Sequence, residues 1–285
     1  MYKRIARLVR RQTAQAAAEV LQALIARGLL VPGVNLAQDS ELSATARARL
    51  KSEYASYRAQ HPEAAAGQLD IEIAERLARW MIATGEKAKA VSKWFVRAAA
   101  QQVTASQRRA LVRAGISPKF LRERWNVPYL KNRYISPTAA QKLPDLIEEM
   151  TGKITNMQAG DLARLRETIT EGLLKGQDIA AIETLLQGMN DFSDARAKRV
   201  ALDQSNKITQ GIEAANALDL GCDTAIWVHI PGQYSSRETH VAMDGKRFKL
   251  SEGLFDSDVN RNVTPGELPF CRCAFRLDIE KLLQK

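Results

Sequence analysis

The sequence predicts a mainly α-helical protein, with a multi-helix N-terminal body followed by a small α+β C-terminal module. From Tyr2 to about Leu220, apolar residues recur every three or four positions, which is the spacing of one face of an α-helix. After Gly221, short segments alternate between apolar and polar residues, as strands do, and Pro-Gly and Asp-Gly pairs separate them. Helices followed by a group of short strands are typical of this two-part architecture.

Length and composition indicate the class of protein. The chain has 285 residues, enough for one large domain or two ordinary ones, and 45% hydrophobic with 26% charged residues is typical of a soluble globular protein. No stretch approaches the ~20 apolar residues that a membrane span needs, so we expect no membrane partner. With three cysteines and no secretion signal, we expect no disulfide framework and a protein that stays where it is made.

Capping residues predict where the helices of the body begin and end. Asp70 should begin a helix that ends near Gly85, and Gly115 should end the next one. Residues 30–40 and 60–70 resemble loops and are the best candidates for hinges. The first helix should bury an apolar face made of Ile5, Leu8, Val9, Val20 and Leu24. Further helices should start at Thr104 (in capping-box spacing with Gln107), Ser117-Pro118, Ser136-Pro137, Asp178 and Asp194.

The last helix of the body should run to about Leu218, and the module should follow it. "TAIWVHI" alternates as a strand, "SRETHVAM" fits two helical turns, and Asp244-Gly245 is a turn signal before "KRFKL". Residues 251–262 are expected to form a long polar loop. "CRCAFRL" alternates again, and "IEKLLQ" should close the chain as a short helix. Apolar residues of the last body helix share one face and comprise Ala201, Ile208, Ile212 and Ala215.

Two of the three cysteines, Cys271 and Cys273, lie one residue apart in this last predicted strand. Side chains at i and i+2 of a strand share a face but lie roughly 6.6 Å apart, too far for an easy disulfide. Both thiols could converge on one zinc ion together with His240, or they could pack in a small core as compact hydrophobes. Further zinc ligands would come from Asp244, Cys222 or His229. Both interpretations stay open at the level of sequence.

The excess positive charge is confined to residues 84–135. This segment holds twelve Lys or Arg and two Glu, while the rest of the chain holds 30 basic and 30 acidic residues. Such a segment could contact phosphates of packaged DNA, dock on an acidic protein surface, or form a solvated face. The candidate binding residues are Lys87, Lys89, Lys93, Arg97, Arg108, Arg109 and Arg113. The aromatic residues interleaved with them, which could stack on bases or pack in a core, are Trp94, Phe95, Phe120, Trp125, Tyr129 and Tyr134.

Four motifs in order resemble the C-terminal signature of bacteriophage Mu F-like minor head proteins, also called phage head morphogenesis proteins. They are the helix of residues 196–221, Trp227 in "WVHI", "SSRETHVAMDG" and "TPGELPFCRC". The motif residues are Trp227, Arg237, His240, Asp244, Gly245, Pro265, Gly266, Cys271, Arg272 and Cys273. The chain departs from the signature where Ser235-Ser236-Arg237 replaces Asp-x-Arg and where Phe270 replaces the Asn before Cys-Arg-Cys.

The resemblance implies a minor structural protein of a tailed-phage head, inside the virion near the portal vertex and in the host cytoplasm during assembly. Its implied partners are the portal protein, the major capsid or scaffolding protein, double-stranded DNA bound non-specifically, and other copies of itself. The family has no established general enzymatic activity. We expect residues 1–158 to form the helical body and residues 159–285 the Mu F-like domain, with helices over 159–220 and the α+β module over 221–285.

His240 supports two interpretations. In a nuclease it would act as general acid or base while Arg237 holds a phosphate. In a structural clasp, Arg237 would bridge Asp244, His240 would bond to backbone, Arg272 could join the cluster, and Gly245 would supply a positive φ. Pro265-Gly266 should set the turn into the last strand. No second catalytic group is recognisable in the sequence, so we expect a clasp and no enzyme.

Overall fold

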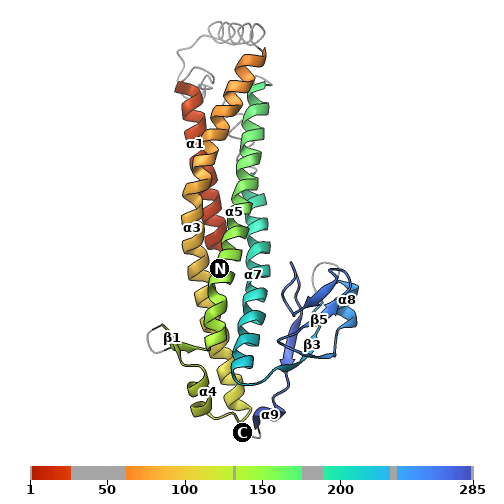
Figure 1. The fold of residues 1–285 in the computed structure, drawn as a ribbon. Coiled ribbons are helices and arrows are strands. Elements are labelled where there is room, and N and C mark those ends of the chain that lie inside the picture. Colours follow the sequence, from red (N-terminus) through yellow and green to blue (C-terminus); the bar gives the residue numbers. More distant parts are fainter. Residues whose placement is uncertain (1, 27–61, 131–132, 175–188, 232–235, 284–285) are drawn as a thin grey trace. The chain divides into compact units, whose positions relative to one another are not determined.

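The computed structural model describes residues 2–26, 62–130, 133–174, 189–231 and 236–283 (Figure 1). The prediction of a mainly helical protein that ends in a small α+β module is confirmed. The helices are α1 (Tyr2–Ala26), α3 (Pro62–Arg113), α4 (Pro118–Arg124), α5 (Pro137–Leu174), α7 (Met189–Asp219), α8 (Glu238–Ala242) and α9 (Glu280–Leu283). The strands are β1 (Val127–Leu130), β2 (Arg133–Ile135), β3 (Thr224–Val228), β4 (Arg247–Lys249), β5 (Leu254–Asp256), β6 (Arg261–Val263) and β7 (Ala274–Leu277).

The chain divides into two compact units. The first unit comprises Met1–Tyr2, Lys89–Thr151 and Arg199–Lys285, and the second comprises Lys3–Ala88 and Gly152–Lys198. Every boundary between the units falls inside a helix, so α3, α5 and α7 each contribute to both units. The domain boundary expected between residues 158 and 159 lies inside α5 and stays a prediction.

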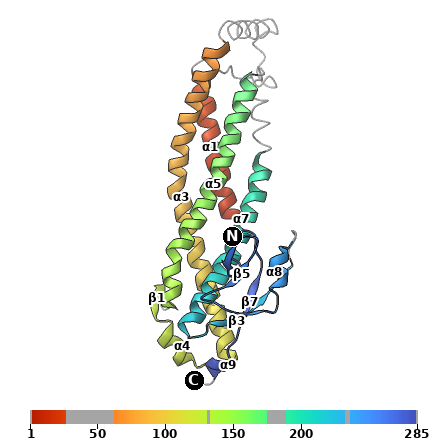
Figure 2. The ribbon, with the colours of Figure 1, turned by 45° about the vertical axis from the view of Figure 1, so that its right-hand side comes forward.

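In the second unit, α1 packs against the parts of α3 and α5 that belong to this unit. Figures 1 and 2 both show these helices side by side. The apolar side chains that meet between them are Ala16, Ala17, Val20, Leu21, Ile73, Leu77, Leu162, Leu165 and Ile169. Of the predicted face of α1, Ile5, Val9 and Val20 are buried and Leu8 is half-buried, whereas the side chain of Leu24 lies outside the described residues.

The helix boundaries predicted within residues 62–113 are wrong, because α3 is continuous from Pro62 to Arg113. Asp70 does not begin a helix, Gly85 does not end one, and the predicted hinge from residue 62 onward is helical. A single interior glycine costs about 1 kcal/mol relative to alanine, which packing of the surrounding turns outweighs. Thr104 and Gln107 are buried inside the helix instead of capping it. The other predicted hinge, residues 30–40, lies outside the described residues.

The later capping predictions are confirmed. α3 ends just before Gly115, which has φ of +100°. The hydroxyl of Ser117 accepts the backbone N–H of Lys119 at 3.2 Å, and that of Ser136 accepts the N–H of Ala139 at 3.2 Å. A proline occupies the first position of α4 and of α5, where a missing N–H costs nothing. The predicted start at Asp194 is wrong because α7 begins at Met189, and Asp178 lies outside the described residues.

One buried asparagine joins three helices of the first unit. The amide nitrogen of Asn216 on α7 donates to Thr104 Oγ1 at 3.1 Å and to Gln107 Oε1 at 2.9 Å, both on α3. Its backbone carbonyl accepts the indole N–H of Trp125, which caps α4, at 3.1 Å. Asn216 is fully buried, so these hydrogen bonds fix the register of α7 against α3. The predicted apolar face of α7, which consists of Ala201, Ile208, Ile212 and Ala215, is also buried.

The C-terminal module, residues 221–283 with the gap at 232–235, lies within the first unit. Its main sheet is antiparallel in the order β4-β3-β7, with Trp227 opposite Phe275 and Ile226 opposite Arg247. β5 and β6 form a second antiparallel pair. The long loop predicted over residues 251–262 is therefore wrong: strands of three residues are too short to show alternation in the sequence. Trp227 is the largest fully buried side chain and lies at the centre of the module's core.

The strand predicted over "CRCAFRL" begins later than expected. β7 starts at Ala274, so Cys271 and Cys273 precede it in an irregular segment. Both thiols nevertheless lie in the same core as Phe275 and Leu277, as the alternation predicts. Among the described residues, no helix has the length and apolar character needed to cross a membrane.

Candidate functional site

A cluster of histidine and cysteine side chains lies in the C-terminal module; we call it the His–Cys cluster. It consists of His229, directly after β3, His240 on α8, and Cys271 and Cys273 before β7. His240, Cys271 and Cys273 are each at least 96% buried, and their ligand atoms lie within 4.8 Å of one another. The main sheet and the turn at Gly245 bring these distant segments together.

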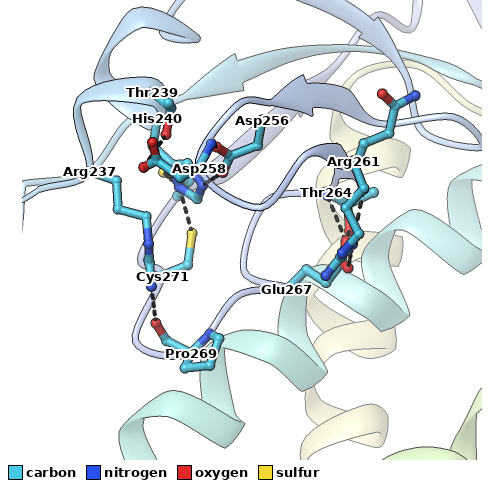
Figure 3. A network of polar contacts seen from close by, with 12 residues as sticks. Arg237, Thr239, His240, Asp256, Asp258, Arg261, Thr264, Glu267, Pro269 and Cys271 are labelled. Atoms are coloured by element: carbon cyan, nitrogen blue, oxygen red, sulfur yellow. Dashed lines mark hydrogen bonds and ion pairs between the residues drawn. The ribbon is translucent and has the colours of Figure 1, made fainter.

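The distances within the cluster are close to contact. Nδ1 of His240 lies 3.4 Å from Sγ of Cys271 (Figure 3). It lies 3.6 Å from Sγ of Cys273. Nδ1 of His229 lies 3.6 Å from Sγ of Cys273. Each imidazole therefore turns its Nδ1 toward sulfur.

The other nitrogen of each imidazole has an oxygen partner. Nε2 of His240 lies 3.0 Å from Oδ2 of Asp256 on β5, whose carboxylate is fully buried. The second oxygen of Asp256 accepts the backbone N–H of Asp258 at 2.9 Å. Nε2 of His229 lies 3.1 Å from the hydroxyl of Ser236. If Nε2 of His240 donates to Asp256, the lone pair of Nδ1 faces the thiols.

The electrostatics of the cluster favour a thiolate at Cys271. Hydrogen bonding from the Cys273 thiol lowers the pKa of Cys271, burial raises it, and the neighbouring His240 and the backbone N–H groups of Gly266 and Cys273 lower it further. The pKa of Cys273 is raised, first because of the adjacent Cys271 and second because of burial. The pKa of His240 is raised because Cys271 and Asp256 both stabilise its charged form, although burial opposes this.

Trp227 faces the same cluster from β3. Its ring meets the ring of His240 edge-on, with centroids 5.3 Å apart. Its indole Nε1 is buried and has no partner of ordinary hydrogen-bond geometry among the described residues. That N–H lowers the pKa of Cys273, against the larger effects of Cys271 and burial, so it stabilises negative charge on the sulfur.

The segment that carries the cysteines is held against α7. The side-chain amide of Asn206 donates to the carbonyl of Cys271 at 2.7 Å, and the carboxylate of Asp203 accepts the backbone N–H of Phe270. Gly266 has φ of +78°, and a Cβ there would lie 2.8 Å from Cγ of Gln210. The turn predicted at Pro265-Gly266 is present, although it leads into the cysteine segment and not directly into β7, and close approach to α7 requires its glycine.

The contacts predicted for a clasp around His240 are wrong for Arg237 and Asp244. Arg237 does not bridge Asp244: its Nη2 donates to the carbonyl of Pro269 at 3.0 Å (Figure 3). Asp244 instead accepts the backbone N–H of His229 at 2.8 Å. α8 covers only Glu238–Ala242, so Arg237 and Asp244 flank it and do not share a helical face with His240.

Two further details of that prediction have clear outcomes. His240 does not bond to backbone; its partners are Asp256 and the two thiols. Gly245 has φ of +74°, as predicted for the turn. Arg272, between the two cysteines, is half-buried, and its place in the cluster stays a prediction.

Asp256 and Ser236 are the partners of the two imidazoles that the sequence did not reveal. Asp256 lies in "LFDSD", inside the segment read as a polar loop, where an aspartate is unremarkable. Its role depends on the β5–β6 pairing, which places it opposite Arg261 and beside α8. Cys222, considered as a zinc ligand, lies elsewhere and donates to the carbonyl of Asp278 at 3.2 Å.

The basic candidate residues all lie on α3. Successive helical residues are rotated by about 100°, so Lys89, Lys93 and Arg97 fall on one side, and Arg109 and Arg113 lie roughly opposite. All five are exposed. Lys87 is exposed and its ammonium lies 3.2 Å from the amide oxygen of Gln12, while Arg108 is half-buried.

The aromatic residues of the basic segment divide between core and surface. Phe95 and Trp125 are buried and pack in the protein, so they offer no stacking surface. Trp94 and Tyr134 are 41% and 52% exposed. Phe120 is half-buried beneath the guanidinium of Arg124, which lies 5.6 Å from the ring centroid. The side chain of Tyr129 lies outside the described residues.

Comparison with known proteins identifies the region that contains the His–Cys cluster. A family model described as "Phage Mu protein F like protein" matches residues 163–276. Neither the curated proteins nor the solved structures gave a match. The matched region runs from α5 to β7 and includes every residue of the cluster. Residues 163–276 are thus similar to Phage Mu protein F-like proteins, in agreement with the resemblance of the four sequence motifs, and we call them the Mu F-like region.

Proposed function

We propose that this chain is a minor structural component of a tailed-phage head that acts at the portal and capsid interior during head assembly. The observation that carries the proposal is that motif side chains from separate segments of the Mu F-like region contact one another in a buried cluster, without a covalent bond between them. Trp227, His240, Cys271 and Cys273 are all at least 96% buried. Side chains in such positions stabilise a module that other proteins can bind, and they do not meet a soluble substrate.

The same burial disfavours the enzymatic alternative. Cys271, His240 and Asp256 are the residue types of a thiol-based catalytic triad, and His240 alone could serve a nuclease. Either chemistry requires a substrate atom within hydrogen-bond reach of the catalytic group. A cleft of about 310 Å³ in the first unit lies between α3, Glu213 of α7 and β7, and none of the cluster residues lines it. The family is a structural head-protein family, which agrees with a role without catalysis.

A nuclease assay separates the two functions. The purified full chain is incubated with labelled DNA and RNA, with and without divalent metal, beside His240→Ala. We expect no cleavage by either protein, because His240 is 2% exposed. Cleavage that is present in the wild type and lost in His240→Ala would show that the cluster is an active site.

Loss of the gene tests the role in assembly. In a phage that lacks the chain, we expect few infectious particles and heads that are defective or fail to form. A plasmid copy of the chain should restore the yield. Normal yields and normal heads without the chain would contradict a role in head morphogenesis.

The basic side of α3 supports a second contact within the same function. Lys89, Lys93 and Arg97 are exposed, and none forms an ion pair with an acidic residue in the described part of the chain. Unpaired cations in a row four residues apart suit a polyanion, so we propose that they contact packaged DNA without sequence preference. An acidic surface of a portal or capsid protein is the alternative partner.

DNA binding should depend on salt through these three residues. Each phosphate contact contributes roughly 0.9 to the slope of log affinity against log salt concentration. Reversing the charge at Lys89, Lys93 and Arg97 should therefore flatten the slope in a filter-binding titration. The matched control reverses three exposed cations elsewhere, Lys142, Lys198 and Arg276, with the same change in net charge. Equal slopes in the wild type and the Lys89/Lys93/Arg97 variant would exclude DNA contact through this face.

A further inference from the structure

We propose that the His–Cys cluster binds one zinc ion, with Cys271, Cys273 and His240 as ligands and His229 as the fourth. The ion would be held entirely by protein atoms and would act structurally. This inference concerns the folding of the module and is independent of the proposed role in the phage head.

The geometry of the cluster matches a tetrahedral site. With Zn–S of about 2.3 Å and Zn–N of about 2.1 Å, tetrahedral angles place sulfur and nitrogen ligands about 3.6 Å apart. The three nitrogen–sulfur distances in the cluster are 3.4, 3.6 and 3.6 Å. Each nitrogen–sulfur pair can therefore occupy one edge of a tetrahedron around a metal ion.

The ligand chemistry is selective for zinc. Two thiolates with two imidazoles are a common structural zinc set, and thiolate ligands disfavour magnesium and calcium. The whole chain has only three cysteines and three histidines, and two of each meet here. Concentrating the chain's scarce soft ligands at one buried point has no explanation in hydrophobic packing, because alanine or valine would pack as well without a buried ionisable group.

Groups around the cluster orient the imidazoles as metal sites require. Histidine ligands normally use their second nitrogen to bond a carboxylate, hydroxyl or carbonyl, which fixes the tautomer and the ring. Asp256 does this for His240 at 3.0 Å, and Ser236 does it for His229 at 3.1 Å. Both contacts use Nε2, which leaves both Nδ1 atoms directed at the sulfurs.

The sulfurs have the surroundings of thiolates. Backbone N–H groups of Gly266 and Cys273 approach Cys271, and that of Ile230 approaches Cys273. The indole N–H of Trp227 is buried without a hydrogen-bond partner among the described residues, and it favours negative charge on Cys273. Two adjacent thiolates repel each other, and a divalent cation between them removes that repulsion.

A zinc ion at this point would cross-brace the module. It would tie the end of β3, helix α8 and the segment before β7, which lie up to 44 residues apart in the chain. The module's strands are only three to five residues long, so they supply few ladder hydrogen bonds. A metal that binds only the folded state adds its binding free energy to the stability of the fold. The alternative is a metal-free cluster in which a Cys271 thiolate pairs with protonated His240.

Metal content separates these alternatives. The full chain is purified without chelator, incubated with zinc, dialysed, and assayed for metals by mass spectrometry. We expect about one zinc per chain, and loss of the metal in Cys271→Ser and Cys273→Ser. Cys222→Ser is the matched control, because Cys222 is buried in the same core but lies outside the cluster, and it should keep its zinc. Less than about half an equivalent in the wild type would overturn the proposal.

Cobalt substitution provides a test that does not depend on whether the serine variants fold. After the wild type is stripped of metal and loaded with Co²⁺, we expect the ligand-field bands of tetrahedral cobalt and thiolate-to-cobalt charge transfer in the near ultraviolet. His240→Cys, which keeps a ligand, should retain the bands with stronger charge transfer. An octahedral cobalt spectrum without thiolate bands would contradict the site.

The zinc affinity of an Asp256 variant tests whether this carboxylate supports the metal site. Asp256→Asn keeps the shape of the side chain but removes the carboxylate that orients His240, and it should weaken zinc binding by about 10- to 100-fold in a competition titration. The exposed neighbour Asp258→Asn is the control and should change affinity little. Equal zinc affinity in the wild type and Asp256→Asn would contradict the orienting role of the carboxylate.

Discussion

At the scale of single residues, the C-terminal module is organised around His240, which has a partner on each ring nitrogen. Asp256 lies on one side and the two thiols on the other, and all of these groups are buried. A buried charged group is costly unless it is paired, so the three positions depend on one another. This coupling explains why the motif residues cluster in space although they span residues 227–273 of the chain.

Phe270, immediately before the cysteine segment, has a backbone conformation that does not suit its side chain. Its φ is +60°, in the left-handed region that Gly and Asn tolerate best, and 56% of the residue is exposed. The Mu F-like signature that the sequence resembles has Asn at this position. Phe270→Asn should therefore raise the free energy of unfolding by roughly 0.5–1 kcal/mol in urea denaturation.

The reverse change provides the control. Asn260 has φ of +53° and is also exposed, so Asn260→Phe should lower stability by about 1 kcal/mol. If Phe270→Asn is instead destabilising, the Phe270 ring makes contacts that its exposure does not reveal, and relief of backbone strain is not the dominant effect.

Predictability at this scale follows the range of the interactions. The positive φ at Gly245 and the turn at Pro265-Gly266 are evident from local turn chemistry, and the structure has both. The partner of His240 is not evident, because Asp256 comes from a strand 16 residues away that the sequence does not reveal. Likewise, Arg237 and Asp244 look like a pair in the sequence, yet each bonds to a backbone group brought in by the fold.

At the scale of elements, α3 shows how tertiary contacts override local signals. The sequence contains a glycine and a capping box that predict two separate helices, and the structure has one helix of 52 residues. Thr104 and Gln107 have the right spacing for a cap, but both side chains bond to Asn216 of α7 instead. Start signals followed by proline, at Ser117 and Ser136, were reliable because proline suits the first position of a helix, where its missing N–H costs nothing.

Removing the Asn216 side chain should show how much its hydrogen bonds to Thr104 and Gln107 stabilise the protein. Asn216→Ala leaves Thr104 and Gln107 buried with fewer partners, so we expect a loss of about 2 kcal/mol in the free energy of unfolding. Gln102→Ala is the control, because Gln102 is exposed on α3, the helix that carries Thr104 and Gln107. It should change the free energy of unfolding by less than about 0.5 kcal/mol. Chemical denaturation followed by tryptophan fluorescence measures both. Similar small effects of the two substitutions would show that the asparagine does not fix α7 against α3.

The turn between β6 and the cysteine segment should make stability depend on pH. Burial raises the pKa of Glu267, but the backbone N–H and hydroxyl of Thr264 and the guanidinium of Arg261 lower it more, so the net pKa lies below the usual 4.5 (Figure 3). A lowered folded-state pKa means that the stabilisation is complete above pH 4.5 and disappears as pH falls through the lower folded-state value.

Glu267→Gln measures this contribution. The substitution should cost about 1 kcal/mol at neutral pH, and the difference from the wild type should shrink as the pH falls below about 4.5. Glu252→Gln, at an exposed residue paired with exposed Lys249, should have little effect at any pH. A difference for Glu267→Gln that grows on acidification would have the wrong sign for this carboxylate.

At the scale of the whole molecule, the Mu F-like region draws on both compact units. Residues 163–198 belong to the second unit, and residues 199–276 belong to the first. Sequence periodicity predicted the helical class and the small module, because many weak apolar signals add over long segments. It could not predict the two units, since these depend on which stretches of α3, α5 and α7 contact each other and not on any break in the chain.

The net positive charge and the Mu F-like region occupy different parts of the chain. All ten net positive charges lie between residues 84 and 135, whereas the Mu F-like match begins at residue 163. The proposed account thus separates two roles along the chain: attachment through a braced C-terminal module, and contact with a polyanion or an acidic surface through exposed cations of α3.

The composition of purified phage particles tests the central claim most directly. Particles of the phage that encodes this chain are purified and separated into heads and tails, and each fraction is analysed by quantitative mass spectrometry. The account predicts that the chain is present in the head fraction, in far fewer copies than the major capsid protein. Its absence from heads, in particles that are otherwise complete, would contradict the account.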